Sequence, residues 1–406
     1  MRRAKKIGIA VVSVLIVVVL FVGLQRLVEP KYDGTDDMPL EGNFTAEYYQ
    51  ETTDHDVIMV GDCEVYENID TMYLWKNYGI TRYIRGNAQQ LTWQSYYMLE
   101  DTLRQEKPKV VIYNVQALEH AEPQRETYNR MTLDGLKWSK TKWDAINASM
   151  CEGESMVDYI LPILRYHSRI TSLSKNDLKY YWQPKKVAHN GYYMRIDVLP
   201  ASESDVADTA WLLGDSEAEE EEETSDDAEE DLWAMMEEEE ASMEEDPDTD
   251  ETEETGETAE DKGVAFGKTP MQYLDKMRKL CEDHDIQLIL MKAPSLSPVW
   301  YDSENKQVLE YAEKYDLPYI NFYDLLEETG IDYETDTYDG GLHLNRSGAD
   351  KLSEYLGKVL TEQYGVQDHR KDTGIAKVYE EKYRFYEDMI EAQQKELDQY
   401  GEIRSY

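Results

Sequence analysis

The fold of this chain can be inferred from one segment, Val57-Ile58-Met59-Val60-Gly61-Asp62-Cys63. Its four apolar residues form a short, β-rich run without polar alternation, which predicts a strand buried on both faces. Further runs of this kind follow at residues 80–84, 110–113, 286–291 and 319–321. Helical apolar spacing at residues 89–105 and 270–283 lies between them. Strands that alternate with helices indicate an α/β fold, with a central parallel sheet covered on both faces.

The charge of the chain is concentrated in one segment. The 406 residues carry a net charge of −43, from 42 Lys or Arg and 85 Asp or Glu. Residues 203–261 hold 30 of these acidic residues and no Lys or Arg, which leaves −13 on the other 347 residues. A nucleic-acid partner is excluded because a binding face for phosphates must be basic. The acidic segment cannot bury enough apolar surface to offset its ordering entropy, so we expect a disordered insertion.

The N-terminus has the pattern of a membrane anchor. Residues 1–6 contain four positive charges, and residues 7–24 are 18 consecutive apolar or small residues. This length is close to the minimum for a helix that spans a bilayer. No small-residue cleavage site follows, so an uncleaved signal anchor is favoured over a cleaved signal peptide. The positive-inside rule then predicts a single-pass cell-membrane protein with a cytoplasmic N-terminus and an extracellular domain.

These observations divide the chain into seven segments. They are a basic cytoplasmic tail (1–6), a transmembrane signal anchor (7–27), a linker (28–54), the first part of an α/β domain (55–202), the acidic insertion (203–262), the second part of the domain (263–366) and a charged helical tail (367–406).

Two motifs carry groups suited to nucleophilic chemistry. Cys63 follows the first strand, and ligands of doubly wound sheets bind at the carboxyl ends of the strands. A thiol at the start of a helix has its thiolate stabilised by the helix dipole. A nucleophile also needs a base. Near the C-terminus the sequence reads Asp339-Gly340-Gly341-Leu342-His343-Leu344-Asn345, in which Asp339 can fix the tautomer of His343.

Gly61-Asp62-Cys63 and the motif from Asp339 to Gly348 resemble the SGNH/GDSL hydrolase superfamily. More narrowly, they resemble its membrane-anchored Gram-positive branch, which is related to cell-surface O-acyltransferases. The resemblance covers about residues 55–200 and 263–365 and implies a flavodoxin-like three-layer sandwich. It makes Cys63 the nucleophile, in place of the usual serine, and His343 the base.

The same resemblance implies the remaining site residues. Asp339 is the acid, although it lies four residues before the histidine rather than the usual three, and Asp336 is the second candidate. The oxyanion would be held by Gly86 and Asn114. Supporting positions are Asp62, Asn87 and Asn345, with Asn87 as the alternative to Asn114.

A literal Gly-Asp-Ser also occurs, at Gly214-Asp215-Ser216. It lies inside the acidic segment, where negative charge would oppose an oxyanion, so Cys63 is favoured as the nucleophile. Three cysteines exclude a disulfide framework, and Cys151 and Cys281 are interpreted as free structural thiols. No metal-binding or nucleotide-binding motif is present, so no metal and no cofactor are predicted.

The predicted function is therefore hydrolysis or O-acyl transfer on acyl esters. An extracellular position makes acylated cell-envelope polysaccharide, or another acyl ester, the expected substrate. The alternative is a catalytically inactive SGNH-fold protein that binds glycan or acts as a scaffold in the cell envelope. The substitution of Cys63 for serine and the shifted Asp339 motivate that alternative.

Overall fold

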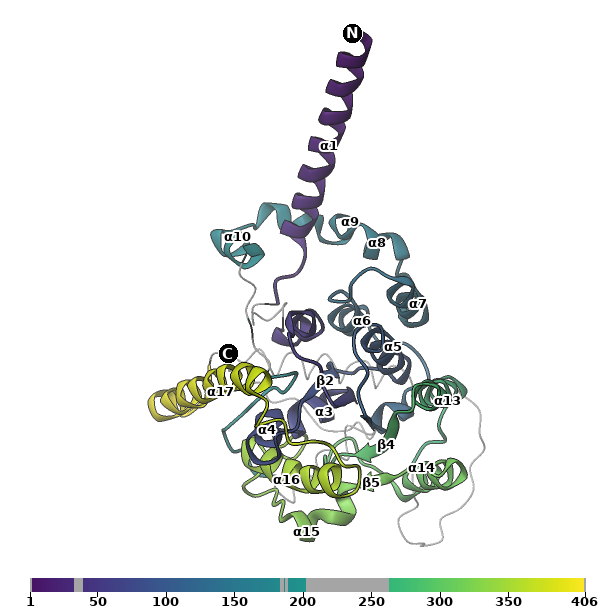
Figure 1. Ribbon diagram of the computed structural model, residues 1–406, viewed down its shortest axis with the longest axis vertical. Coiled ribbons are helices and arrows are strands. Elements are labelled where there is room, and N and C mark those ends of the chain that lie inside the picture. The colour runs from purple at the N-terminus through teal and green to yellow at the C-terminus, as the bar shows by residue number, and fades with distance from the viewer. Residues whose placement is uncertain (1, 33–38, 183–185, 187–188, 202–262, 405–406) are drawn as a thin grey trace, which may run out of the picture.

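The computed structural model describes residues 2–32, 39–182, 186, 189–201 and 263–404 (Figure 1). The acidic segment at 203–262 and its Gly214-Asp215-Ser216 motif lie outside the described residues.

A parallel sheet of five strands forms the centre of the described structure. The strands are β1 (Val57–Gly61), β2 (Arg82–Gly86), β3 (Val110–Asn114), β4 (Gln287–Lys292) and β5 (Tyr319–Asn321), and their spatial order is β2-β1-β3-β4-β5. All four pairings are parallel, and Gly61 lies opposite Gly86 where β1 and β2 end. The predicted α/β class with a parallel sheet is confirmed. The chain leaves β1 towards β2 and later returns on the other side to β3, so the turns after β1 and β3 meet at the carboxyl edge of the sheet.

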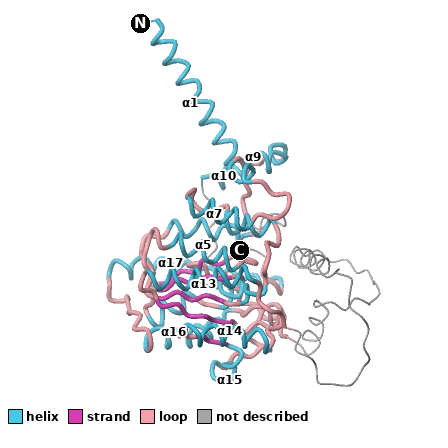
Figure 2. Tube along the Cα trace, turned by 90° about the vertical axis from the view of Figure 1, so that its right-hand side faces the viewer, coloured by secondary structure: helices cyan, strands magenta, loops and turns pink. Residues whose placement is uncertain are grey.

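Helices cover both faces of this sheet (Figure 2). One face packs against α3 (Cys63–Asn68), α4 (Thr71–Tyr78), α16 (Arg346–Glu362) and α17 (Thr373–Tyr400). The other packs against α5 (Thr92–Thr102), α7 (Lys140–Ser149), α13 (Lys268–Asp283) and α14 (Asp302–Tyr315). Successive strand residues point to opposite faces, so Val57 and Met59 enter the first core and Ile58 and Val60 the second. Burial on both sides explains the continuous apolar residues of β1 and β3 and of the middle of β4.

Two predicted elements have different ends in the structure. The second strand begins at Arg82 rather than at residue 80, because Gly79 ends α4 in a left-handed conformation and the Ile80 N–H is bonded to Leu74 O. The helix expected at 89–105 spans Thr92–Thr102, because a turn precedes it in which the Gln90 N–H bonds to Asn87 O.

The remaining described elements are short, apart from the first. They are α1 (Arg2–Val28), η1 (Leu40–Asn43), α2 (Phe44–Glu47), η2 (Tyr48–Gln50), η3 (Gln116–Glu119), α6 (Glu126–Leu133), α8 (Met156–Ile160), α9 (Pro162–Tyr166), η4 (His167–Thr171), α10 (Lys175–Trp182), η6 (Phe322–Leu325) and α15 (Leu326–Thr329).

The two segments that flank the domain pack against it where they are described. In the expected linker, Leu40, Phe44 and Tyr48 are buried, so residues 39–50 form part of the packed structure. In the expected helical tail, α17 buries Tyr379, Tyr386 and Gln393 at a spacing of seven residues. A seven-residue repeat places side chains on one stripe of a helix.

Helix α1 projects away from the α/β domain (Figure 2). Lys5–Val28 is 24 residues long, and its most apolar stretch of 18 residues has a mean hydropathy of 3.2 and is not buried. The helix is therefore long and apolar enough to cross a membrane.

Candidate functional site

The turn from β1 into α3 places Cys63 at the carboxyl edge of the sheet. A Cβ at Gly61 would lie 2.4 Å from Val65 Cγ2 and 2.9 Å from Asn114 Cβ, so only glycine permits the close packing of this turn. The Asp62 carboxylate then caps α3 by accepting a hydrogen bond from the Glu64 N–H at 3.2 Å. Cys63 is the first residue of the helix and is partly buried.

The loop before α16 brings His343 to the same edge. Asp339 Oδ1 accepts the His343 N–H at 2.8 Å, and Asp339 Oδ2 lies 2.7 Å from His343 Nδ1. Gly340 and Gly341 both have positive φ, at 76° and 106°, and this turn folds the carboxylate back onto the ring. The turn explains how an aspartate four residues before the histidine reaches it.

His343 lies close enough to the Cys63 thiol that its charge and hydrogen-bonding capacity act to lower the pKa of that thiol. The structure thus brings Cys63, His343 and Asp339 together in the order of a nucleophile, a base and an orienting acid. Asp336 is directed elsewhere, because its carboxylate pairs with Lys351 and accepts the Asp332 N–H at 2.8 Å.

Sequence reasoning missed a second carboxylate at this histidine. Glu67 Oε2 lies 3.7 Å from His343 Nδ1 and accepts a hydrogen bond from the Tyr338 hydroxyl. The Tyr338 ring stacks on the imidazole, with centroids 6.1 Å apart and planes at 18°. The sequence spacing could have indicated Glu67 as a site residue, because Cys63 and Glu67 are four residues apart and therefore share one face of α3.

The two carboxylates and the burial of the site change the pKa values of Cys63 and His343. Burial raises the pKa of Cys63 to about 11, and the nearby His343 only partly opposes this shift. Burial of the thiol therefore acts against the thiolate that the start of α3 was expected to stabilise. Burial alone would lower the pKa of His343, but Glu67, Asp339 and Cys63 together raise it well above its usual value. Both shifts favour the protonated forms of the thiol and the imidazole.

A buried cluster of charged and polar groups lies beside the thiol. Lys292 Nζ is 2.7 Å from Glu64 Oε1, and both side chains are almost fully buried. Asn114 Nδ2 donates to Glu64 Oε2 at 2.9 Å and to Asp62 Oδ1 at 3.2 Å. Burial, followed by repulsion from Glu64, raises the pKa of Asp62 to about 7. The amide hydrogens of Asn114 are thus directed at two carboxyl groups.

The other predicted positions fall into two groups. Gly86 packs against the turn from β1 into α3, because a Cβ there would lie 3.0 Å from Gly61 O and 3.2 Å from Asp62 O. Asn87 points away from the thiol and donates to Glu41 O and Met131 O, both at 3.1 Å. Asn345 caps α16, and its Oδ1 accepts from two backbone N–H groups at the start of that helix.

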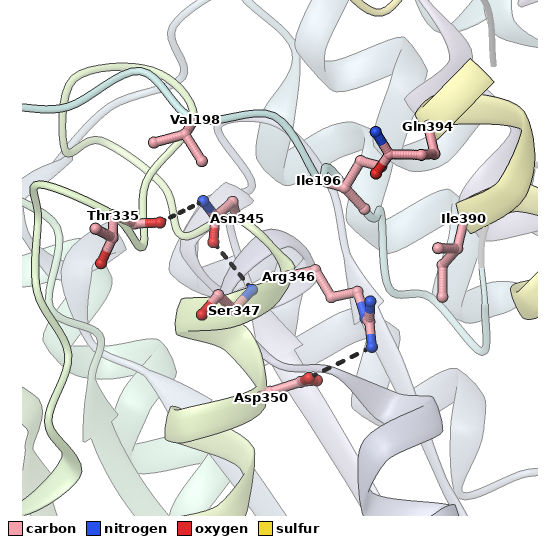
Figure 3. Close-up of a pocket in the computed structure, with 9 residues that line it drawn as sticks. All are labelled: Ile196, Val198, Thr335, Asn345, Arg346, Ser347, Asp350, Ile390 and Gln394. Carbon is pink, nitrogen blue, oxygen red and sulfur yellow. Dashed lines mark hydrogen bonds and ion pairs between the residues drawn. The ribbon is translucent and has the colours of Figure 1, made fainter. Parts of the chain in front are cut away.

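An open cavity of about 360 Å³ lies at the start of α16 (Figure 3). Asn345 is on its wall and donates to Thr335 O at 2.9 Å, while Arg346 and Asp350 face one another across 3.9 Å. Neither Cys63 nor His343 lines this cavity. Asn345 therefore connects the wall of the cavity to the loop that carries His343.

Within the described ranges no group of three or more His, Cys, Asp or Glu side chains could hold a metal ion. No family model, no curated protein and no solved structure matches this chain.

Proposed function

We propose that this chain is a membrane-anchored hydrolase or O-acyltransferase of the SGNH/GDSL type, which uses Cys63 as its nucleophile on acyl esters of cell-envelope glycans. The observation that carries the proposal is the contact sequence from Cys63 through His343 to Asp339. Its position at the carboxyl edge of a parallel sheet, between two strand-end turns, supports it further.

The strand order supports the finer fold assignment. The order β2-β1-β3-β4-β5 is that of flavodoxin-like doubly wound sheets, and two helical layers cover the sheet. We therefore assign the domain to that three-layer sandwich. Helix α1 would anchor it, with the basic N-terminus in the cytoplasm and the domain outside the cell.

The proposed reaction has two steps. In the first, the Cys63 sulfur attacks the acyl carbonyl, and His343 accepts the thiol proton and returns it to the departing alkoxide. The products are a thioester on Cys63 and a free alcohol. In the second, water or a glycan hydroxyl attacks the thioester while His343 accepts its proton. That proton then returns to the sulfur, which yields a free acid or a new ester.

The oxyanion of each step needs hydrogen-bond donors. The backbone N–H groups of Gly86 and Cys63 are the proposed donors, since Gly86 lies against the Gly61-Asp62 backbone. Asn114 contributes if its amide exchanges one of its two carboxyl partners for the oxyanion.

One observation favours the second candidate, a non-catalytic protein that binds glycan or acts as a scaffold. The carboxyl groups of Asp62 and Glu67 act on the thiol, and burial together with these groups raises the pKa of Cys63 to about 11. Negative charge at this position opposes an oxyanion.

Ester turnover by the full-length chain in detergent separates the two candidates. With p-nitrophenyl acetate, Cys63→Ala and His343→Ala should each abolish turnover, whereas Cys63→Ser should retain it. Cys151→Ala is the matched control because Cys151 is a second partly buried free thiol, and Ser216→Ala tests the alternative motif. Neither of these variants should change the rate. If wild type and Cys63→Ser are both inert, and Cys63 alkylates no faster than Cys151, the non-catalytic candidate replaces the enzyme.

A further inference from the structure

Short helices surround the end of α1 where it meets the domain. Residues 156–182, called the collar here, comprise α8, α9, η4 and α10, of which α9, η4 and α10 pack against α1 (Figure 1). Arg169 ties them together, since its Nη1 donates to Val28 O at 3.2 Å and its Nη2 lies 2.9 Å from Asp177 Oδ1. Val28 is fully buried. The collar and the last turn of α1 therefore form one packed unit.

Each collar helix has an outward apolar face. Tyr159 and Asp177 turn inward and are buried. The exposed apolar side chains are Val157, Ile160, Leu164, Ile170, Leu178 and Trp182, with exposed fractions from 43% to 77%. Val157 and Ile160 of α8 are spaced by three residues and Leu178 and Trp182 of α10 by four, so each pair lies on one face of its own helix. This surface faces away from the domain core.

The collar is also basic in a strongly acidic protein. Residues 156–182 contain four Lys or Arg and two Asp, whereas the whole chain carries −43. Lys175 and Lys179 are exposed on α10 beside Leu178. Helices with apolar and basic side chains on their exposed surface are typical of the membrane interface, where tryptophan is also enriched.

The length of α1 sets the depth of the collar. Its apolar run of 18 residues, 7–24, is about 27 Å long at the helical rise of 1.5 Å per residue. A bilayer core is about 30 Å thick, so the last turn of α1 emerges among the lipid headgroups. Side chains that touch Val28 and Glu29 must lie at the same depth.

We propose that the collar lies in the headgroup layer of the bilayer that α1 spans, with its apolar side chains inserted at the acyl boundary. This surface holds the α/β domain at a fixed height and orientation on the membrane. The proposal rests on the membrane insertion of α1 and is independent of any catalysis by Cys63.

Photolabelling of the full-length chain tests this surface. The protein is reconstituted into phosphatidylcholine vesicles that contain a phospholipid with a diazirine close to its headgroup, and the adducts are mapped by mass spectrometry. We expect adducts in α1 and in residues 156–182. Leu309 on α14 is the matched control, because it is as exposed as Ile160, at 43%, but lies on a helix of the α/β domain. Collar labelling should exceed Leu309 labelling several-fold.

A double variant sharpens the test. Leu164→Glu with Leu178→Glu changes two exposed residues, so the fold should persist while collar labelling falls several-fold and α1 labelling is unchanged. Labelling of α1 with no more labelling in the collar than at Leu309 would overturn the collar proposal alone. Absence of labelling in α1 would overturn the membrane anchor together with the collar, whereas the ester assay would remain a separate test of Cys63.

Discussion

At the scale of single residues, His343 determines how the site can work. Two carboxylates approach its Nδ1, Asp339 at 2.7 Å and Glu67 at 3.7 Å, and they stabilise the protonated ring. An imidazole that accepts the Cys63 proton must first be neutral. Because the pKa of His343 is raised, the neutral ring forms only as the pH rises above the ordinary histidine range. Activity should therefore increase towards alkaline pH.

Glu67→Gln should move this increase to lower pH. The variant keeps the size of the side chain but removes the strongest of the interactions that raise the pKa of His343. The imidazolium then loses its proton more readily, and the midpoint of kcat/KM against pH should fall by about one pH unit.

The control for this experiment is Glu310→Gln, which changes an exposed glutamate on α14 that pairs only loosely with Lys306, at 4.0 Å. It should leave the midpoint unchanged. A purely structural role for Glu67 would lower the rate at every pH without moving the midpoint, and that result would contradict the assigned electrostatic role.

At the scale of elements, α17 is a helix of charged composition that nevertheless buries one of its faces against the domain. Its composition is charged, yet Tyr379 is fully buried and stacks on Trp75 of α4, with centroids 4.2 Å apart. The Tyr386 hydroxyl bonds to Asp70 and to Arg346 Nε, which link α17 to the starts of α4 and α16. This helix therefore secures two helices on the face of the sheet that carries Cys63.

Replacement of Tyr379 by alanine should lower the free energy of unfolding by about 3 kcal/mol, because it removes a buried ring and leaves a cavity against Trp75. Urea unfolding followed by circular dichroism measures the loss. Tyr400→Ala is the matched control at the exposed end of the same helix, where 47% of the residue is accessible, and it should have little effect. Equal effects of the two variants would show that α17 does not pack as described.

At the scale of the whole molecule, the acidic segment interrupts the sequence of the α/β domain, and the residues on both sides of it are hydrogen-bonded to that domain. Before the segment, the Leu199 and Ala201 N–H groups bond to the carbonyls of Thr337 and Tyr333. After it, the Val264 N–H bonds to Glu304 Oε1 at 2.7 Å. Each flank is therefore held by the domain independently of residues 203–262.

Deleting residues 205–260, with a short Gly-Ser linker in their place, should leave the melting temperature within a few degrees of wild type. The reason is that the acidic composition offers little apolar surface for burial, so few contacts are lost. Differential scanning fluorimetry of both proteins checks this expectation. A much larger decrease would mean that the segment packs on the domain.

The direction of insertion belongs to the same scale. A C-terminal reporter that is active only in the cytoplasm should be inactive when fused to the full chain, because the four basic residues before the apolar run stay inside. The same fusion without residues 2–28 should regain activity. Strong cytoplasmic activity of the full-length fusion would place the domain on the other side of the membrane.

Local patterns in the sequence were enough to predict the class of the fold and to select the residues of the candidate site. Continuous apolar runs indicated β1, β3 and β4, because strands buried on both faces are rich in apolar residues. The position of Cys63 after a strand and the proximity of Asp339 to His343 also follow from neighbours in the chain. The candidate membrane-spanning helix was recognisable from its sequence because one such helix must satisfy the bilayer by itself.

Contacts between distant segments required the tertiary structure. The strand order, the burial of α17 and the packing of residues 39–50 depend on which surfaces meet, and no local pattern encodes this. Lys292 pairs with Glu64, which lies 228 positions away in the sequence, and Asn114 donates a hydrogen bond to the same Glu64 carboxylate. The four-residue spacing in the sequence was enough to place Glu67 on the same helix face as Cys63. The effect of Glu67 on His343 arises only because the loop before α16 returns to α3, since electrostatic interactions depend on distance in space.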